Sequence, residues 1–455
     1  MSILSTGLSG LNAAQNALNT TSNNISNVYT PGYNRELTIL GEGRGDGGVR
    51  VNDIQRQFNQ YVANQLNSAT SSSSALAAYQ GQISQIDNLL ADRDAGLAPL
   101  MQSFFSSLED LASAPSDPAA RQGVLGTAQT LAAQFQSFDS YLQDMQEGIN
   151  GQIRDEVTQI NNTTEQLATL NREIGLARAR SGEAPNGLLN QRDQLVAELS
   201  ERMDVRVVIQ DGKTYNVSLP NGQPLVSGTN HNKLEAMDAP DDPQRKVLGY
   251  RDSGQNLVAL AEDTVKGGTL GGLMAFRSES LDKAQDQLGE LAVALAEGFN
   301  EVHEGGYDLN GNTGITFFEI EPANLGRAAS SLKVAITNVD QIAAAEESGA
   351  TGDNRNALAL QDLQSKPLVG GKATLNQAYA SMVSDVGNKT NVVQVNLEAR
   401  QGLTDQLRAV QQSESGVNLD EEAANLLRYQ QFYAANARVI DTASTIFDTI
   451  LGLRS

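Results

Sequence analysis

The feature that most constrains the fold is a row of apolar residues that repeats every seven positions near the C-terminal end. The acidic residues 420–422 stand at the start of this row, where the positive end of a helix dipole favours carboxylates. A helix over 419–451 would be about 50 Å long, which is too long for a compact domain to cover. The row consists of Leu419, Leu426, Tyr433, Ile440 and Phe447.

A second row with the same seven-residue spacing lies at the N-terminal end. A stripe this narrow is typical of a coiled-coil seam, whereas a helix that covers its own domain has a wider apolar face. The helix should end by Pro31, because the residue before a proline is pushed out of helical geometry. We therefore predict that the two terminal helices pair as a coiled coil or with a neighbouring molecule, and that their rows form an assembly interface. The N-terminal row consists of Leu4, Leu11, Leu18 and Ile25, with Leu8 between them.

The chain between the two ends alternates helical and β patterns. Apolar residues at helical spacing predict long antiparallel helices over 75–200, after a polar patch that ends at 71–74. Alternating residues predict a β-hairpin at 36–54 and a β-rich insert after residue 203. A strand is also expected at 332–336. The predicted fold class is therefore mainly α with small β inserts.

These patterns divide the chain into four predicted domains. The ends form a terminal helical domain with a short β-hairpin, and the middle forms a long-helix body. A β-rich domain and a mixed α/β insert interrupt the body, and the mixed insert could pack against the β-rich domain. The predicted ranges are 1–66 with 405–455 for the terminal domain, 67–203 with 268–305 and 366–404 for the body, 204–267 for the β-rich domain, and 306–365 for the mixed insert.

The composition argues against most chemistry. The chain has no cysteine, two histidines and no tryptophan, which removes cysteine nucleophiles, cysteine-ligated metals and most stacking platforms. Its net charge of −22 repels a phosphate backbone, and no stretch is apolar enough to span a membrane. The first basic residue is Arg35, so we expect no cleavable secretory signal. We predict a non-enzymatic assembly protein without cofactor or metal, and without a nucleic-acid or membrane partner.

Two loops imitate ligand-binding motifs. Gly43, Gly45 and Gly48 match a dinucleotide fingerprint, but a strand-like segment follows where the fingerprint requires a helix, so we expect a hairpin loop. The segment 308–319 places oxygen ligands at four positions of a calcium loop, namely Asp308, Asn310, Asn312 and Glu319. Thr313 occupies the position that needs glycine, so an ordinary Asn-Gly turn is favoured over a calcium site.

The two histidines offer little for catalysis. His303 and Glu304 begin like a zinc-protease motif, but Tyr307 replaces its second histidine. His231 lies between two asparagines in a polar segment. We expect both histidines to be surface residues.

Two segments carry a family resemblance. The run Asn23-Asn24-Ile25-Ser26-Asn27, followed by Thr30-Pro31-Gly32-Tyr33, resembles the N-terminal signature of flagellar rod, hook and hook-associated proteins. The segment 416–427 resembles the corresponding segment of the hook-associated protein 1 family. The motif residues are Asn23, Asn24, Asn27, Thr30, Pro31, Gly32, Tyr33, Asn418, Glu422 and Asn425.

The resemblance implies a structural subunit of the bacterial flagellum at the junction between hook and filament. It implies an extracellular location, reached through the flagellar type III export apparatus without a cleaved signal peptide. The implied partners are further copies in a ring or helical layer, the hook protein, the second junction protein (hook-associated protein 3) and an export chaperone on the C-terminal helix. One alternative is a hook or rod protein, and the middle of a hook protein should be mostly β. From a different class, a secreted coiled-coil adhesin or a glycan-acting enzyme is the alternative.

Overall fold

The computed structural model of the 455-residue chain describes residues 3–43, 47–92, 96–182, 185–210, 214–240, 242–252 and 254–452. Its residue contacts divide the chain into two compact units. The first unit comprises Met1–Ser73, Gln159–Lys233 and Ala399–Ser455, and the second comprises Ser74–Thr158 and Leu234–Glu398. Three boundaries between the units fall inside the long helices α2 (Gln60–Leu90), α4 (Pro118–Ser181) and α10 (Leu375–Ser415), and the fourth falls just before Leu234, at the start of a strand.

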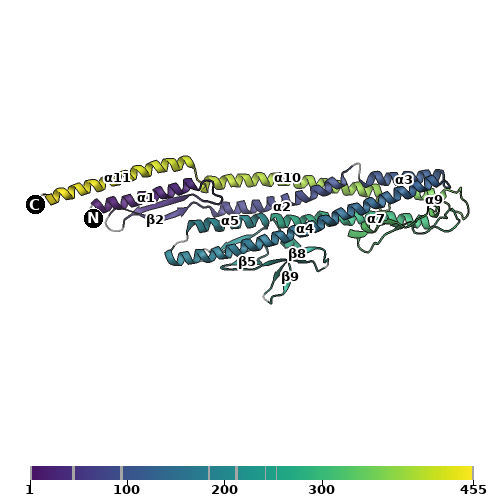
Figure 1. Ribbon diagram of the computed structural model, residues 1–455, viewed down its shortest axis with the longest axis horizontal. Helices are drawn as coiled ribbons and strands as arrows, with labels where there is room; N and C mark the ends of the chain where they lie inside the picture. The colour runs from purple at the N-terminus through teal and green to yellow at the C-terminus, as the bar shows by residue number, and fades with distance from the viewer. Residues whose placement is uncertain are drawn as a thin grey trace. The chain divides into compact units, whose positions relative to one another are not determined.

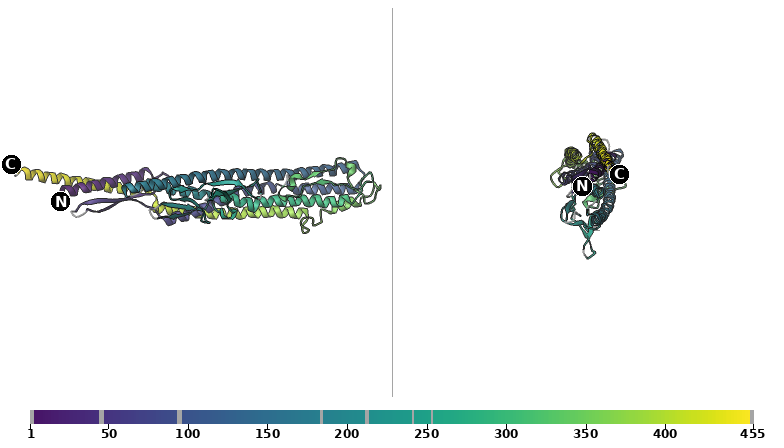
Figure 2. Two further views of the ribbon diagram at one scale, coloured as in Figure 1. Left: turned by 90° about the horizontal axis from the view of Figure 1, so that it is seen from below. Right: turned by 90° about the vertical axis from the view of Figure 1, so that its left-hand side faces the viewer.

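In the first unit the two chain ends lie side by side. Helix α1 (Ile3–Ser26) contacts α11 (Leu419–Gly452), and both views of the ribbon show the two helices next to each other (Figures 1 and 2). Strands β1 (Glu36–Glu42) and β2 (Val49–Arg56) form an antiparallel hairpin that packs against α1. The hairpin predicted from the sequence is therefore confirmed.

The rest of the first unit joins helices to a four-stranded antiparallel sheet. The sheet contains β3 (Arg206–Ile209), β4 (Tyr215–Ser218), β5 (Pro224–Ser227) and β6 (Asn230–His231), and the C-terminal part of α4 and α5 (Asn186–Arg202) supply the helices. The buried side chain of Asn171 on α4 donates to the carbonyls of Tyr215 and Gly228, each over 2.8 Å. The guanidinium of Arg192 lies 3.4 Å from the ring centroid of Tyr215. These contacts fix the sheet to the helices.

The second unit is built from helices with two small antiparallel sheets. Besides parts of α2, α4 and α10, its helices are α3 (Leu97–Ser113), α6 (Gly268–Phe276), the π-helix η2 (Arg277–Leu281), α7 (Asp282–Glu304), α8 (Leu325–Ser331) and α9 (Arg355–Asp362), with short 3-10 turns η1 (Glu262–Thr264) and η3 (Val339–Gln341). One sheet contains β7 (Leu234–Asp238), β8 (Lys246–Arg251) and β9 (Leu257–Ala259), and the other pairs β10 (Phe318–Glu319) with β11 (Lys333–Val334).

Aromatic side chains form the centre of the second unit. Phe104 on α3, Phe299 on α7, and Phe317 and Phe318 near β10 have no exposed surface. The ring centroids of Phe299 and Phe317 are 4.6 Å apart, and those of Phe104 and Phe299 are 5.4 Å apart. Burial of rings in such tilted and edge-on arrangements contributes more than their area alone. The second unit therefore has a core of its own.

The mainly α fold with small β inserts is confirmed, with differences in detail. The serines at 71–74 lie inside α2, where the Ser72 hydroxyl donates to the Ser68 carbonyl over 3.0 Å. A serine can rejoin the helix ladder in this way, so a polar run need not end a helix. The strand expected at 332–336 is only Lys333–Val334. Segment 204–267 contributes one sheet to each unit, and its status as a single domain stays a prediction.

The expectation that His303 is a surface residue is wrong. Its side chain is fully buried on α7, where Nδ1 donates to the Ile315 carbonyl over 2.7 Å and Nε2 accepts from the Ala343 amide over 3.0 Å. The amide can only donate, so the proton lies on Nδ1 and the imidazole is neutral. Burial lowers the pKa of His303 to about 4. The residue thus crosslinks two backbone segments of the second unit.

Candidate functional site

Helix α1 presents three different faces. One face consists of small, buried residues that follow the alternating three- and four-residue spacing of a coiled-coil seam. A second carries the predicted apolar row, and a third is rich in asparagine. We call the first the small-residue face, formed by Gly7, Gly10, Ala14, Ala17, Thr21 and Asn24, and the second the leucine face, formed by Leu4, Leu8, Leu11, Leu18 and Ile25.

The small-residue face is the one that packs on α11. A Cβ atom added at Gly7 would lie 2.9 Å from Cγ1 of Ile440, and one added at Gly10 would lie 2.0 Å from Oδ1 of Asn436. Glycine therefore leaves room for the Ile440 and Asn436 side chains of α11 against the backbone of α1. Further along, the Asn24 side chain reaches Glu422 over 3.2 Å, which makes the pairing antiparallel. In this register the start of α1 lies opposite residue 443, and α11 continues beyond it.

The leucine face is only partly covered within the chain. Leu8 is 52 % exposed and Leu4 is equally accessible, while Leu11, Leu18 and Ile25 are half-buried. On α11, Leu426 and Ile440 are half-buried, whereas Leu419, Tyr433 and Phe447 are exposed. The seven-residue period thus identified a real apolar face on α1, but the face that packs within the chain is the small one. The only sequence signal for the small-residue face was a repeat of glycine, alanine and threonine with the same period.

A buried polar cluster fastens the first part of α11 to the N-terminal segment. Glu422 has 1 % of its surface exposed and Asn24 has none. The Asn24 amide donates to the Glu36 carbonyl over 2.9 Å, and its oxygen accepts from the Tyr33 hydroxyl over 2.8 Å and the Glu36 amide over 2.9 Å. We call this cluster, with Arg35 and Glu421, the terminal clasp.

Arg35 completes the terminal clasp. Its Nε lies 2.7 Å from one carboxylate oxygen of Glu422, and its Nη1 lies 2.6 Å from Glu421. The Arg35 amide also donates to the Ser415 carbonyl over 2.9 Å. Burial, with the nearby Glu36 and Glu422 carboxylates, raises the pKa of Tyr33 above its ordinary value, so Tyr33 acts as a neutral donor. A charge this deeply buried needs such pairing, because an unpaired one would be strongly destabilising.

The same loop is anchored on its other side to α5. The Asn34 amide donates to Oδ1 of Asn190 over 2.8 Å, and Arg56 lies 2.6 Å from Oδ2 of Asp193. Gly32 has a φ of 74°, and a Cβ added there would lie 2.9 Å from Oε1 of Gln194. The left-handed backbone and the close contact both favour glycine at this position.

The remaining motif residues shape the ends of the two helices. Asn418 Oδ1 accepts from the Asp420 amide over 3.0 Å at the start of α11, as an N-cap residue does. At the end of α1, the Asn27 amide side chain donates to the Asn23 carbonyl over 2.9 Å, and Thr30 donates to Asn27 over 3.1 Å. Pro31 is exposed in the following turn, and Asn425 is half-buried on α11. The motif is therefore a structural connector between helices.

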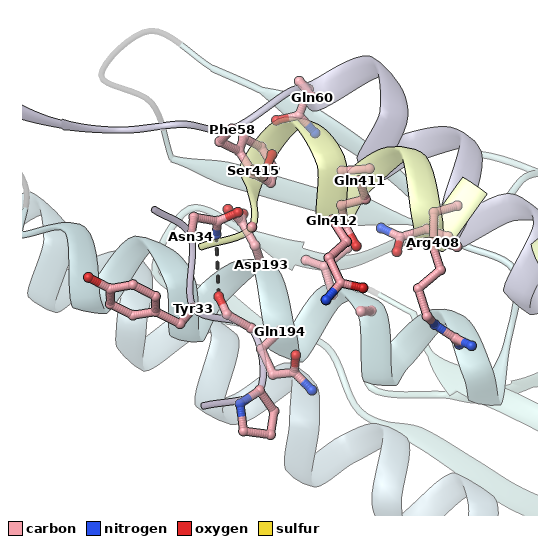
Figure 3. A pocket seen from close by; sticks show the side chains of 18 of the residues that line it. Tyr33, Asn34, Phe58, Gln60, Asp193, Gln194, Arg408, Gln411, Gln412 and Ser415 are labelled. Atoms are coloured by element: carbon pink, nitrogen blue, oxygen red, sulfur yellow. Dashed lines mark hydrogen bonds between the residues drawn. The ribbon is translucent and has the colours of Figure 1, made fainter. Parts of the chain in front are cut away.

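A cavity of about 480 Å³ lies beneath this connector (Figure 3). Tyr33 and Asn34 border it from the loop, Asp193 and Gln194 from α5, and Gln411, Gln412 and Ser415 from the end of α10. The lining mixes amide groups with apolar side chains and contains no arrangement of nucleophile and base. The cavity is a feature of the connector.

The ligand-binding loops considered from the sequence are occupied by internal contacts. Asp308 Oδ1 accepts from the amides of Asn310 and Asn312, both over 2.8 Å, and Glu319 lies 3.1 Å from Lys333. The Gly43 amide donates to the Gly48 carbonyl over 3.0 Å, as in a hairpin, while Gly45 lies outside the described residues. Across the described ranges, no group of three or more histidine, aspartate or glutamate side chains is placed to hold a metal.

Within the described ranges, no helix combines the length and the apolar character that crossing a bilayer requires.

Comparison with known families places three segments of the chain. A model of the helical domain of flagellar hook-associated protein FlgK matches residues 83–318. A model of flagella basal body rod proteins matches residues 4–34, and a model of the C-terminal part of flagellar basal body rod FlgEFG proteins matches residues 411–453. The two rod-protein matches cover α1 and α11, the helices joined by the terminal clasp.

Full-length relatives and a solved structure agree with these matches. The chain is 38% identical to flagellar hook-associated protein 1 of Salmonella typhimurium and to that of Escherichia coli, and each comparison covers 100% of both proteins. It is 27% identical to the Bacillus subtilis protein of the same name over 98% of this chain and 97% of that protein. The flagellar hook junction protein FlgK from Burkholderia pseudomallei has a similar fold, with a TM-score of 0.71 and 24% identity over 77% of this chain and 100% of that one.

Proposed function

Because this chain belongs to the flagellar hook-associated protein 1 family, we propose that α1 and α11 carry the contacts that build it into the flagellum. The chain is a structural component of the flagellum at the hook–filament junction. The family is one of structural flagellar proteins, which fits the connector chemistry of its buried polar groups.

The observation that carries the proposal is the exposed leucine face of α1. Within one chain, the small-residue face already contacts α11, so the leucine face is left for another molecule. Burial of one such side chain contributes roughly 1.5–3 kcal/mol, so a neighbour that covers the row would gain several kcal/mol per subunit. The assembly residues proposed from the sequence on α1 stay in this role. Those on α11 divide between contacts with α1 and contacts with other subunits.

The test is a charge placed on the leucine face. Leu8→Asp should leave the isolated protein folded with an unchanged melting temperature, because Leu8 is 52 % exposed. In cells that rely on the variant, filaments should be lost, because an unpaired charge would enter the subunit interface. Asn16→Asp on the asparagine-rich face adds the same charge on the same helix and should retain filaments, because Asn16 is exposed on a different side of α1. Normal filaments with Leu8→Asp, or equal loss with Asn16→Asp, would contradict the proposal.

The partners proposed from the family are other axial components. They are further copies in a ring or helical layer, the hook protein on one side and the second junction protein, hook-associated protein 3, on the other. We also propose that an export chaperone covers the apolar end of α11 before assembly, and that export to the cell exterior proceeds without a cleaved signal peptide. The exposed side chains of Ile446, Phe447 and Ile450 support a need for such a cover.

A further inference from the structure

The end of α11 continues an apolar face past the point where α1 stops. Asn436 and Ile440 lie on the side of α11 that faces α1, and Phe447 follows Ile440 by seven residues, in the same row. In the observed register α1 begins opposite residue 443, so residues 446–452 form an overhang. Ile446, Phe447, Ile450 and Leu451 in this overhang are 47–62 % exposed. The face that is covered by α1 elsewhere thus has no cover from α1 here.

The charge distribution favours a second copy of this chain as the cover. The protein has a net charge of −22, so most of its surfaces repel another copy. Helix α1 is the exception, because residues 3–26 contain no charged side chain. The overhang contains one, Asp448. These two surfaces can therefore meet without the repulsion that the rest of the molecule would experience.

The two surfaces also match in size. Leu4, Leu8 and Leu11 span two turns of α1, or about 10 Å along the helix. The overhang of 446–452 has a similar length. Within one chain, α11 meets α1 through the small-residue face, so the leucine face is turned elsewhere. A contact between them joins different patches on two copies, and repeated contacts of this kind generate a ring or a helix rather than a closed dimer.

We propose that the overhang of α11 in one subunit packs on the leucine face of α1 in a neighbouring subunit. This proposal rests on the assembly role of the terminal helices and names the partner surface for each. Phe447 and Ile450 supply the apolar side chains, and Leu4, Leu8 and Leu11 receive them. The contact is heterologous and repeats from subunit to subunit.

Cysteine crosslinking tests the contact directly, since the chain has no native cysteine. Cells would express two versions together, one with Leu8→Cys and one with Phe447→Cys, and a short bis-maleimide would be added to isolated hook–filament particles. We expect a crosslinked dimer at least tenfold above the yield with Asn16→Cys in place of Leu8→Cys, because Asn16 is exposed on a different side of α1. Equal yields from Leu8→Cys and Asn16→Cys in particles that carry filaments would overturn this contact and leave the assembly role intact.

A pair of opposite charges introduced at Leu8 and Phe447 tests the contact even if the single variants fail to assemble. Leu8→Lys and Phe447→Glu should each reduce the number of filaments per cell at least tenfold. The double variant should recover filaments several-fold over either single variant, because each contact then pairs a lysine with a glutamate. Asn16→Lys combined with Phe447→Glu should give no recovery, because Asn16 lies on a different side of α1. Absence of recovery in the Leu8→Lys, Phe447→Glu double variant would refute the proposed pairing.

Discussion

The terminal helix pair and the aromatic core of the second unit differ in which side chains they bury and which they expose. Phe299 and its neighbours are fully buried within one chain, and their rings contact one another at 4.6–5.9 Å. On the terminal helices, large apolar residues such as Leu8 and Phe447 are more than half exposed. What is buried there is small or polar, namely glycine, alanine and the terminal clasp.

The difference shows how stability and assembly are separated in this molecule. The second unit places its apolar area where it stabilises the single chain. The terminal helices are held to each other by the packing of small residues and by the terminal clasp, which leaves large apolar residues such as Leu8 and Phe447 exposed, and we propose that other subunits cover them. A substitution of the same kind should therefore have opposite consequences in the two regions.

The largest expected effect comes from removing an aromatic ring in each region. Phe299→Ala should lower the free energy of unfolding of the second unit by about 3–5 kcal/mol, because it leaves a cavity among packed rings. Phe447→Ala should change the stability of the isolated chain by less than about 0.5 kcal/mol, yet reduce filament assembly. Urea unfolding, monitored by hydrogen exchange of the amides of α7 and α11, would measure the change in stability of each variant. A large loss of stability with Phe447→Ala would mean that α11 is part of an internal core.

A smaller effect is expected from the terminal clasp. Arg35→Met removes the cation beside the buried Glu422 carboxylate and should lower the free energy of local opening of α11 by about 3 kcal/mol. Hydrogen exchange should then accelerate for the amides of α11 and stay unchanged for α7. Lys333→Met is the matched control, because the ion pair of Lys333 with Glu319 is exposed and should contribute at most about 1 kcal/mol. Unchanged protection of α11 in Arg35→Met would show that the clasp does not hold the helix.

The smallest effect concerns pH and the second unit alone. The pKa of His303 is about 4 in the folded protein and about 6.5 when exposed, so the unfolded chain takes up a proton first as the pH falls. The neutral imidazole stabilises the fold above pH 6.5, and this contribution decreases by about 2 kcal/mol between pH 7 and pH 5. Burial raises the pKa of Asp139 to about 6, which changes stability in the opposite direction over the same range.

The pH dependences of stability from His303 and Asp139 partly cancel in the wild-type protein. The measurement therefore compares wild type with His303→Gln. The variant keeps a donor and an acceptor but does not titrate. Relative to wild type, its free energy of unfolding should rise by about 2 kcal/mol between pH 7 and pH 5. Parallel pH profiles for the two proteins would show that His303 is not held neutral by the fold.

Sequence periodicity predicted the large features of the molecule and missed those that depend on small or distant residues. The leucine face was recognisable because leucine carries a strong apolar signal every seven positions. The small-residue face has the same period, but glycine and alanine add little to such a signal. His303 was assigned to the surface because its local sequence is polar, whereas its partners Ile315 and Ala343 come from separate segments.

The terminal clasp shows what local patterns cannot reveal. The family resemblance identified Asn24, Tyr33 and Glu422 as motif residues, but it did not predict that they contact one another. Arg35 was noted only as the first basic residue of the chain, although it is the cation that the buried Glu422 requires. No pattern within a helix indicates a partner that lies 387 residues away.

That separation sets the order in which the molecule can be completed. While a chain emerges from its N-terminal end, α1 and Arg35 are available long before α11, and closing so large a loop is among the last steps of folding. Until then Asn24 lacks its carboxylate partner and the small-residue face lacks its cover. A molecule that ends before residue 421 cannot close the clasp, so it cannot hold its leucine face on a supported helix. The pairing of the two ends thus requires a chain that has been made to its last helix, because only then does α1 have its cover and Asn24 its carboxylate partner.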